Sequence, residues 1–177
     1  MSLSRFVAAL LMVAGVSALG GCGFEPLHGR QSASSAAEMA TVRIAIIEDR
    51  VGQQLRNRLL QRMQPRGGSD NPKWSLSVTL SESIDEVLVE ESSFGTRANL
   101  RLTASFQLQS TDYGDGISAS RSGSTRSIAS YNILDSEFEY ANLIAERDAR
   151  ERALDQLASD ITRQVSLWLR DAAPESG

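Results

Sequence analysis

Apolar and polar residues alternate along much of the chain, and this alternation predicts β-strands because successive side chains of a strand point to opposite faces. Residues 73–81 alternate Trp74, Leu76, Val78 and Leu80 with serine or threonine. Residues 96–109 carry five apolar side chains on one face, namely Leu100, Leu102, Ala104, Phe106 and Leu108. Residues 41–47 predict a first strand, with Val42, Ile44 and Ile46 on one face. Residues 117–131 predict a fourth strand, which is unusually polar.

Two details of these strands concern their pairing. The second strand is expected to continue through residues 84–90, where Val87 and Val89 have the opposite parity from Leu88. That change of phase predicts a bulge or bend near Asp85 and Glu86. The turn at residues 112–116 predicts a hairpin centred near Gly114, so facing residues of strands three and four should have numbers that sum to about 228, to within two residues.

Apolar residues at helical spacing predict two helices. The first covers residues 51–63, with Val51, Leu55, Leu59 and Met63 on one stripe, and ends at Pro65–Gly68. The second opens at residues 135–139 and runs to about Leu169. Its apolar stripe consists of Leu154, Leu157, Ala158, Ile161, Val165 and Trp168, preceded by the small residues Ala141, Ala145 and Ala149. The i,i+4 pairs Glu146–Arg150 and Arg147–Glu151 are expected on its solvent side.

The predicted fold class is therefore α+β, with the order β-α-β-β-β-α and a four-stranded sheet with two helices packed on one face. The other face of the sheet carries mostly Ser, Thr, Asn and Gln. It is either a solvated face or a surface that meets a polar, uncharged environment such as sugars or a polar protein lumen. Residues 30–40 are Ser/Ala-rich and are interpreted as a linker, with a short helix as the alternative, and residues 171–177 as a flexible tail.

The N-terminal residues have the parts of a secretory signal. Arg5 precedes an apolar run at residues 6–19, and small residues lead to Cys22, the one cysteine of the chain. Leu19-Gly20-Gly21-Cys22 resembles a bacterial lipoprotein box, which predicts a signal peptide at residues 1–21 and acylation, including palmitate, at Cys22. The alternative is an ordinary signal or anchor helix with an incidental cysteine. Gly23, in place of the aspartate that marks inner-membrane retention, favours the outer membrane, with the domain on its periplasmic side.

Charge and chemistry then narrow the function. The net charge is −4, or −5 once Arg5 is removed, which argues against nucleic acid as a partner. The one histidine, His28, leaves no multi-histidine metal site, and no cofactor is expected. Asp135, Glu137 and Glu139 could be proposed as an acid pair, but a helix N-terminus explains them better. Without a G-x-S-x-G motif, the chain is predicted not to be an enzyme.

Several segments together resemble one protein family. These are Cys22-Gly23-Phe24, Pro26–Gly29, Phe94–Leu100, Tyr131–Asp135 and the Arg/Glu-rich last helix. Together with the predicted element order, these segments resemble the LptE family of lipopolysaccharide-assembly lipoproteins. The resemblance covers nearly all of the mature chain. The resemblance implies a lipidated N-terminus and linker at residues 22–40 and an LptE-like domain at residues 41–170. It also implies a non-enzymatic plug, one to one, inside the outer-membrane β-barrel LptD, which assists assembly of the barrel and lipopolysaccharide transport to the cell surface.

The resemblance further implies contact with lipopolysaccharide, whose phosphates need basic side chains. On the predicted register, Arg101 faces Ser127 and Arg121 faces Gln107, so Arg97, Arg101, Arg121 and Arg126 form a basic strip. The alternative is that these are ordinary strand-edge arginines. Residues 90–96 and 112–116 are candidate contacts to the barrel wall. The alternative function is a free periplasmic lipoprotein that binds a soluble ligand or peptidoglycan.

Overall fold

The computed structural model describes residues 30–87, 96–111, 119–134 and 136–172. The chain divides into two units, residues 1–33 and 34–177, and all the β-strands belong to the second. The predicted signal peptide, Cys22 and His28 lie outside the described residues, as do the turn 112–116, Asp135 and most of residues 90–96. No described helix is long and apolar enough to cross a membrane.

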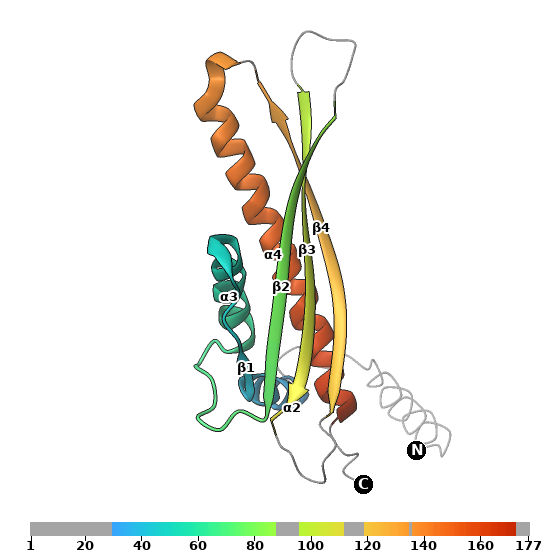
Figure 1. Cartoon of the computed structure of the whole chain (residues 1–177). Coiled ribbons are helices and arrows are strands. Elements are labelled where there is room, and N and C mark those ends of the chain that lie inside the picture. Colours follow the sequence, from blue (N-terminus) through green and yellow to red (C-terminus); the bar gives the residue numbers. More distant parts are fainter. Residues whose placement is uncertain (1–29, 88–95, 112–118, 135, 173–177) are drawn as a thin grey trace, which may run out of the picture. The chain divides into compact units, whose positions relative to one another are not determined.

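One mixed, four-stranded sheet organises the second unit (Figure 1). Its strands are β1 (Val42–Ile44), β2 (Trp74–Val87), β3 (Thr96–Ser110) and β4 (Ser120–Ile133), paired in that order. β1 runs parallel to β2, and the other neighbours are antiparallel. The predicted α+β class and the strand-helix order are thus confirmed.

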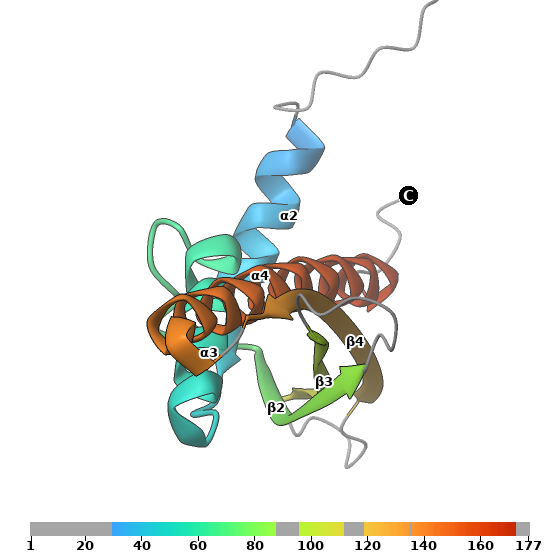
Figure 2. The same ribbon diagram turned by 90° about the horizontal axis from the view of Figure 1, so that it is seen from above.

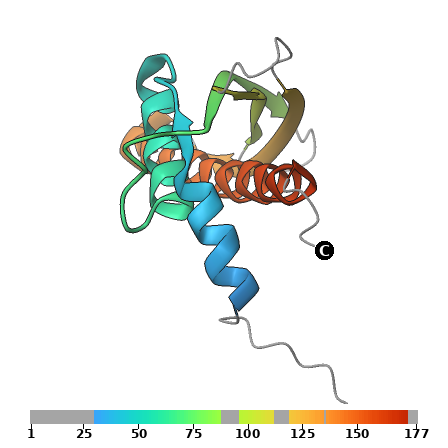
Figure 3. The ribbon, with the colours of Figure 1, turned by 90° about the horizontal axis from the view of Figure 1, so that it is seen from below.

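Two helices, α3 (Asp49–Met63) and α4 (Glu139–Ala172), pack on the same face of this sheet (Figure 2). A one-turn 3-10 helix, Ser136–Phe138, precedes α4. Residues 30–40 form a helix, α2 (Arg30–Ala40), which is the alternative that the sequence left open for the predicted linker (Figure 3). Met39 of α2 packs against the core.

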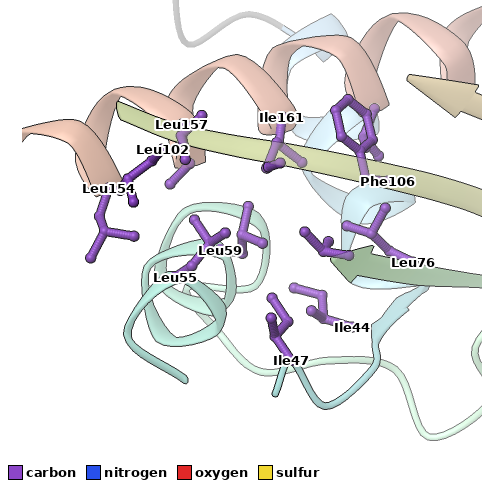
Figure 4. Packing of buried hydrophobic residues seen from close by; sticks show 14 of the residues in the cluster. Ile44, Ile47, Leu55, Leu59, Leu76, Leu102, Phe106, Leu154, Leu157 and Ile161 are labelled. Atoms are coloured by element: carbon purple, nitrogen blue, oxygen red, sulfur yellow. The ribbon is translucent and has the colours of Figure 1, made fainter. Parts of the chain in front are cut away.

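The core fills the layer between the sheet and the two helices (Figure 4). The five predicted side chains of β3 are all buried, and Leu55, Leu59 and Met63 of α3 face them as predicted. Each fully buried leucine or isoleucine contributes about 1.5–3 kcal/mol relative to an exposed one. The buried residues of α4 begin only at Ala149, and Val78 is the last buried residue among the described side chains of β2. The core therefore occupies one part of the sheet and leaves the far ends of β2 and α4 without it.

The structure corrects the predicted bulge in β2. The pairing of β2 with β3 keeps one register from Trp74↔Ser110 to Val87↔Arg97, so the strand has no bulge at Asp85 or Glu86. Beyond Leu80 the core-facing positions Glu82, Ile84 and Glu86 are not buried. The core therefore places no requirement for apolar residues there, and the hydrophobic pattern does not report the pairing of this part of β2.

The structure corrects two further predictions, the length of β1 and the pairing of β3 with β4. β1 is shorter than residues 41–47, and Ile46, predicted on the buried face, is 82% exposed. The pairs of β3 and β4 sum to 229, as in Arg101↔Ile128, so the predicted pairing of Arg101 with Ser127 is one residue off. A shift by one residue moves every side chain of β4 to the other face relative to its expected neighbours.

Candidate interaction surface

The face of the sheet that points away from α3 and α4, here called the outer face, is almost entirely polar. β2 contributes five hydroxyl side chains to it, β3 contributes Gln107 and Gln109, and β4 contributes four serines. Among the outer-face side chains that the structure describes, Ile128 is the one apolar residue. The hydroxyl residues are Ser75, Ser77, Thr79, Ser81 and Ser83 of β2, Thr103 and Ser105 of β3, and Ser120, Ser122, Ser124 and Ser130 of β4.

Short hydrogen bonds tie these side chains to the sheet. Gln107 donates its Nε2 amide to the hydroxyl of Ser120 at 2.7 Å, and the Ser130 hydroxyl donates to Asn99 Oδ1 at 2.7 Å. Between the rows lies a shallow hollow of about 470 Å³, lined mainly by Ser, Thr and Gln. No charged residue lines this hollow among the described residues. Its chemistry suits contact with other polar groups and with water.

Three of the four predicted arginines share this outer face. Arg97 and Arg101 lie on β3, and Arg126 lies on β4 beside Thr103, diagonal to Arg101. Arg101 forms an ion pair with Asp85 of β2, with 2.8 Å between Nη1 and Oδ2, while its buried Nε finds no hydrogen-bond partner in the described structure. Arg97 and Arg126 are exposed and form no ion pair with described residues.

Arg121 does not belong to this group. It pairs with Leu108 rather than with Gln107, which puts it on the helix side of the sheet. There its Nη1 lies 3.4 Å from Oδ2 of Asp171, near the end of α4. Arg121 and Arg126 are an odd number of residues apart on β4, so only one of them can share the face of Arg97 and Arg101. The observed register places Arg126 on that face, where the predicted register would have placed Arg121. The structure brings three of the four residues together.

A second polar cluster, unpredicted from the sequence, lies on the helix side where the core ends. Arg150 of α4 donates to Glu82 of β2, with Nη2–Oε1 at 2.7 Å and Nε–Oε2 at 3.0 Å, and to Glu146 at 2.5 Å. The hydrogen bonds to Glu82 are the largest cause that raises the pKa of Arg150 above its ordinary value. Burial, followed by the carboxylate of Glu146, raises the pKa of the neighbouring Tyr131.

This cluster corrects the placement of one predicted ion pair. Arg147–Glu151 lies in solvent as expected, at 3.1 Å, but Glu146–Arg150 faces the sheet, and the Arg150 side chain is only 22% exposed. One feature of the sequence does indicate that Glu82 has a charged partner. Glu82 continues the parity of Leu76, Val78 and Leu80, and a carboxylate at a core-facing position needs a partner.

The remaining candidate residues give no catalytic arrangement within the described part of the chain. Glu139 is exposed at the first residue of α4, and Glu137 is exposed in the 3-10 helix just before it, where the helix dipole favours negative charge. The described residues contain no group of three or more His, Cys, Asp or Glu side chains that could hold a metal ion. The lipidation of Cys22 stays a prediction.

A family model described as "LptE: Lipopolysaccharide-assembly" matches residues 39–166, which include the whole sheet, α3 and most of α4. No match was found among curated proteins.

One solved structure shows the same fold, and two others resemble this chain less closely. A protein of Caulobacter crescentus CB15, described as a candidate lipoprotein, is 22% identical, with a TM-score of 0.60 over 80% of this chain and 98% of that one. A minor lipoprotein of Acinetobacter baumannii is 21% identical, with a TM-score of 0.44 over 71% and 91% of the two chains. The rare lipoprotein B of Shewanella oneidensis is 10% identical, with a TM-score of 0.47 over 74% and 97%.

Proposed function

The chain belongs to the LptE family of lipopolysaccharide-assembly proteins, and on that premise we propose that it is an outer-membrane lipoprotein that occupies the lumen of the LptD β-barrel. In this role it assists assembly of the barrel and supports transport of lipopolysaccharide to the cell surface. Acylated Cys22 anchors it to the membrane on the periplasmic side, and residues 22–40, including α2, connect the anchor to the domain. No catalysis and no cofactor enter the proposal.

The polar outer face is the observation that carries this proposal. The interior of a large outer-membrane barrel is polar and hydrated. A sheet face of short hydroxyl and amide side chains can exchange its water for the hydrogen-bonding groups of such a wall at little cost, because each buried polar group finds a partner. An apolar face would instead favour a lipid or a second apolar surface. Ile128 alone interrupts the polar character of the described face.

Co-purification tests the proposal directly. The full chain, expressed with LptD and extracted in mild detergent, should be recovered with the barrel at one to one, and its depletion should leave the barrel misassembled. A photo-reactive residue at Ser105, in the middle of the outer face, should cross-link to LptD. Recovery of the chain alone, without any LptD cross-link from Ser105 or from Gln53 on the exposed side of α3, would contradict the proposed partner.

The three outer-face arginines are proposed to contact the phosphates of lipopolysaccharide. Arg97 and Arg126 have no competing carboxylate among the described residues, and guanidinium groups bind phosphate through paired hydrogen bonds. Reversing the charge at Arg101 and Arg126 should weaken lipopolysaccharide binding at least tenfold. Arg121→Glu, on the opposite face, is the matched control and should leave binding unchanged. Equal binding by the native chain and the double variant would rule out this contact.

A further inference from the structure

The layer between the sheet and α4 opens into a groove beyond the end of the core. The groove measures about 670 Å³, within the usual range of ligand-binding clefts. Its walls continue the core-facing positions of β2 and β4 on one side and the first two turns of α4 on the other. The lining residues are Ile84, Glu86, Tyr131, Ile133, Glu139, Tyr140, Asn142, Leu143 and Glu146.

Hydrogen bonds between α4 and the strands on the opposite wall fix the groove at both ends. At the core end, Arg150 ties α4 to Glu82 of β2. At the far end, the side-chain amide of Asn142 binds the backbone of Leu134 twice. It accepts a hydrogen bond from the Leu134 N–H at 2.7 Å and donates one to the Leu134 carbonyl at 2.9 Å. The groove is therefore a built feature of the fold and does not arise from fraying of the helix end.

The wall contributed by α4 exposes large apolar side chains. Tyr140 is 76% exposed and Leu143 is 61% exposed, and Ile84 on the opposite wall is 41% exposed. Phe138 and Leu134, just outside the groove, are also about half exposed. Contiguous exposed apolar groups with a polar rim mark interaction sites. Tyrosine is common among the residues that dominate binding energy at protein interfaces.

The charges around these apolar side chains are negative. Glu86, Glu139 and Glu146 line the groove, and Arg150, the ion-pair partner of Glu146, is shared with Glu82. Such a rim repels phosphates and anionic lipid headgroups and attracts cationic side chains. The groove is therefore negatively charged where the outer face carries arginines. The two surfaces are expected to bind different classes of ligand.

We infer that this groove binds a protein segment in which an apolar side chain is flanked by lysine or arginine. The apolar side chain packs between Tyr140, Leu143 and Ile84, and the flanking cations pair with Glu86 and Glu139. The inference rests on the charge and shape of the groove, and it does not depend on the identity of the proposed barrel partner.

A defined peptide can test this. The probe is a benzophenone-labelled octapeptide of alternating lysine and leucine, cross-linked to the full chain in a zwitterionic detergent and mapped by mass spectrometry. Cross-links are expected on the first turns of α4 and on the ends of β2 and β4. Their yield should fall at least tenfold with a glutamate–leucine or a lysine–serine peptide, and it should also fall when the salt concentration rises.

Variants at exposed positions separate binding from folding. Tyr140→Ser with Leu143→Ser removes the apolar wall, and Glu86→Lys with Glu139→Lys reverses the rim. Each pair should lower the cross-linking yield at least tenfold. Leu167→Ser and Asp148→Lys alter exposed residues of α4 outside the groove and should leave the yield unchanged.

Three results would overturn the inference. One is an unchanged yield in both pairs of variants, and another is an equal yield with the glutamate–leucine peptide. The third is self-association of the chain that the same variants abolish, since the groove would then hold a second copy.

Discussion

Arg150 marks the residue at which the apolar core gives way to polar contacts. Ala153 and Leu154, just after it on α4, are fully buried, whereas the residues before Ala149 are not. Its guanidinium spans the layer that leucine side chains fill elsewhere and satisfies two carboxylates that are themselves only 25% and 31% exposed. Removing one partner of such a cluster leaves the other charges partly desolvated without a counter-charge, and this lowers the stability of the fold.

Arg150→Met should therefore lower the free energy of unfolding by about 1.5–3 kcal/mol, the range for hydrogen bonds to charged groups. Arg147→Met removes a similar i,i+4 pair in solvent and should change stability by less than about 0.5 kcal/mol. Denaturant unfolding of both variants measures the difference. Equal losses in the two variants would show that the contact to Glu82 adds nothing.

Asp85 competes with any anionic ligand for Arg101. Both side chains of this ion pair are well exposed, so the pair contributes at most about 1 kcal/mol. Asp85→Asn should release Arg101 and strengthen lipopolysaccharide binding about two- to fivefold, as measured by titration at fixed salt. Ser83→Asn, at the next outer-face position of β2, is the control for the substitution itself. Weaker binding in Asp85→Asn would argue against a role for Arg101.

At the scale of elements, the close approach of α4 to β4 depends on small side chains on the inner face of β4. Gly123, Ser127 and Ala129 lie on that face, and a Cβ atom at Gly123 would come within 3.0 Å of Phe106 and 3.1 Å of Trp168. These two rings pack against each other with their centroids 5.5 Å apart. The glycine thus makes room for an aromatic pair that joins β3 to α4.

Gly123→Val should push this aromatic pair apart and destabilise the fold by about 1–3 kcal/mol, the usual cost of overpacking. Tryptophan fluorescence should change with it, because the surroundings of Trp168 change. Ser122→Val places the same side chain on the outer face, where it should alter stability by less than about 0.5 kcal/mol. Unchanged fluorescence and stability in Gly123→Val would mean that the two elements can separate freely.

The helices and strands could be predicted wherever one of their faces is buried in the core. The faces of β3, α3 and the second half of α4 followed from periodicity, because burial imposes that periodicity on the sequence. The register of β4 and the position of Arg150 depend on contacts between distant segments. A polar strand such as β4 gives no hydrophobic pattern that would fix its register. The parity of Arg121 and Arg126 separates them onto two faces, but the structure was needed to show which of them lies beside Arg97 and Arg101.

At the scale of the whole domain, stability is distributed unevenly. In α4 the buried side chains lie between Ala149 and Leu169, and in β2 they end at Val78. The other end of the domain is held by the Arg150 cluster and by the hydrogen bonds of Asn142. Regions with few buried apolar contacts open at lower free energy than the core does.

Hydrogen exchange should report this gradient. Amides of residues 139–148 should exchange at least tenfold faster than those of residues 153–165, although both segments belong to one continuous helix. Mass spectrometry of overlapping peptides resolves the two segments. Binding of the lysine–leucine peptide in the groove should slow exchange in the first segment and leave the second unchanged. Uniform protection along α4 would contradict the gradient.

The shortness of β1 has a consequence for the isolated protein. β1 pairs with only Trp74, Ser75 and Leu76, so among the described strands the rest of β2 has no neighbour on that side, and β4 has none on its own outer edge. Open edges of long strands are templates for intermolecular pairing. The free domain is therefore expected to be lost to edge-to-edge aggregation before it unfolds. Its lifetime in the cell would then be set by how quickly a partner covers those edges.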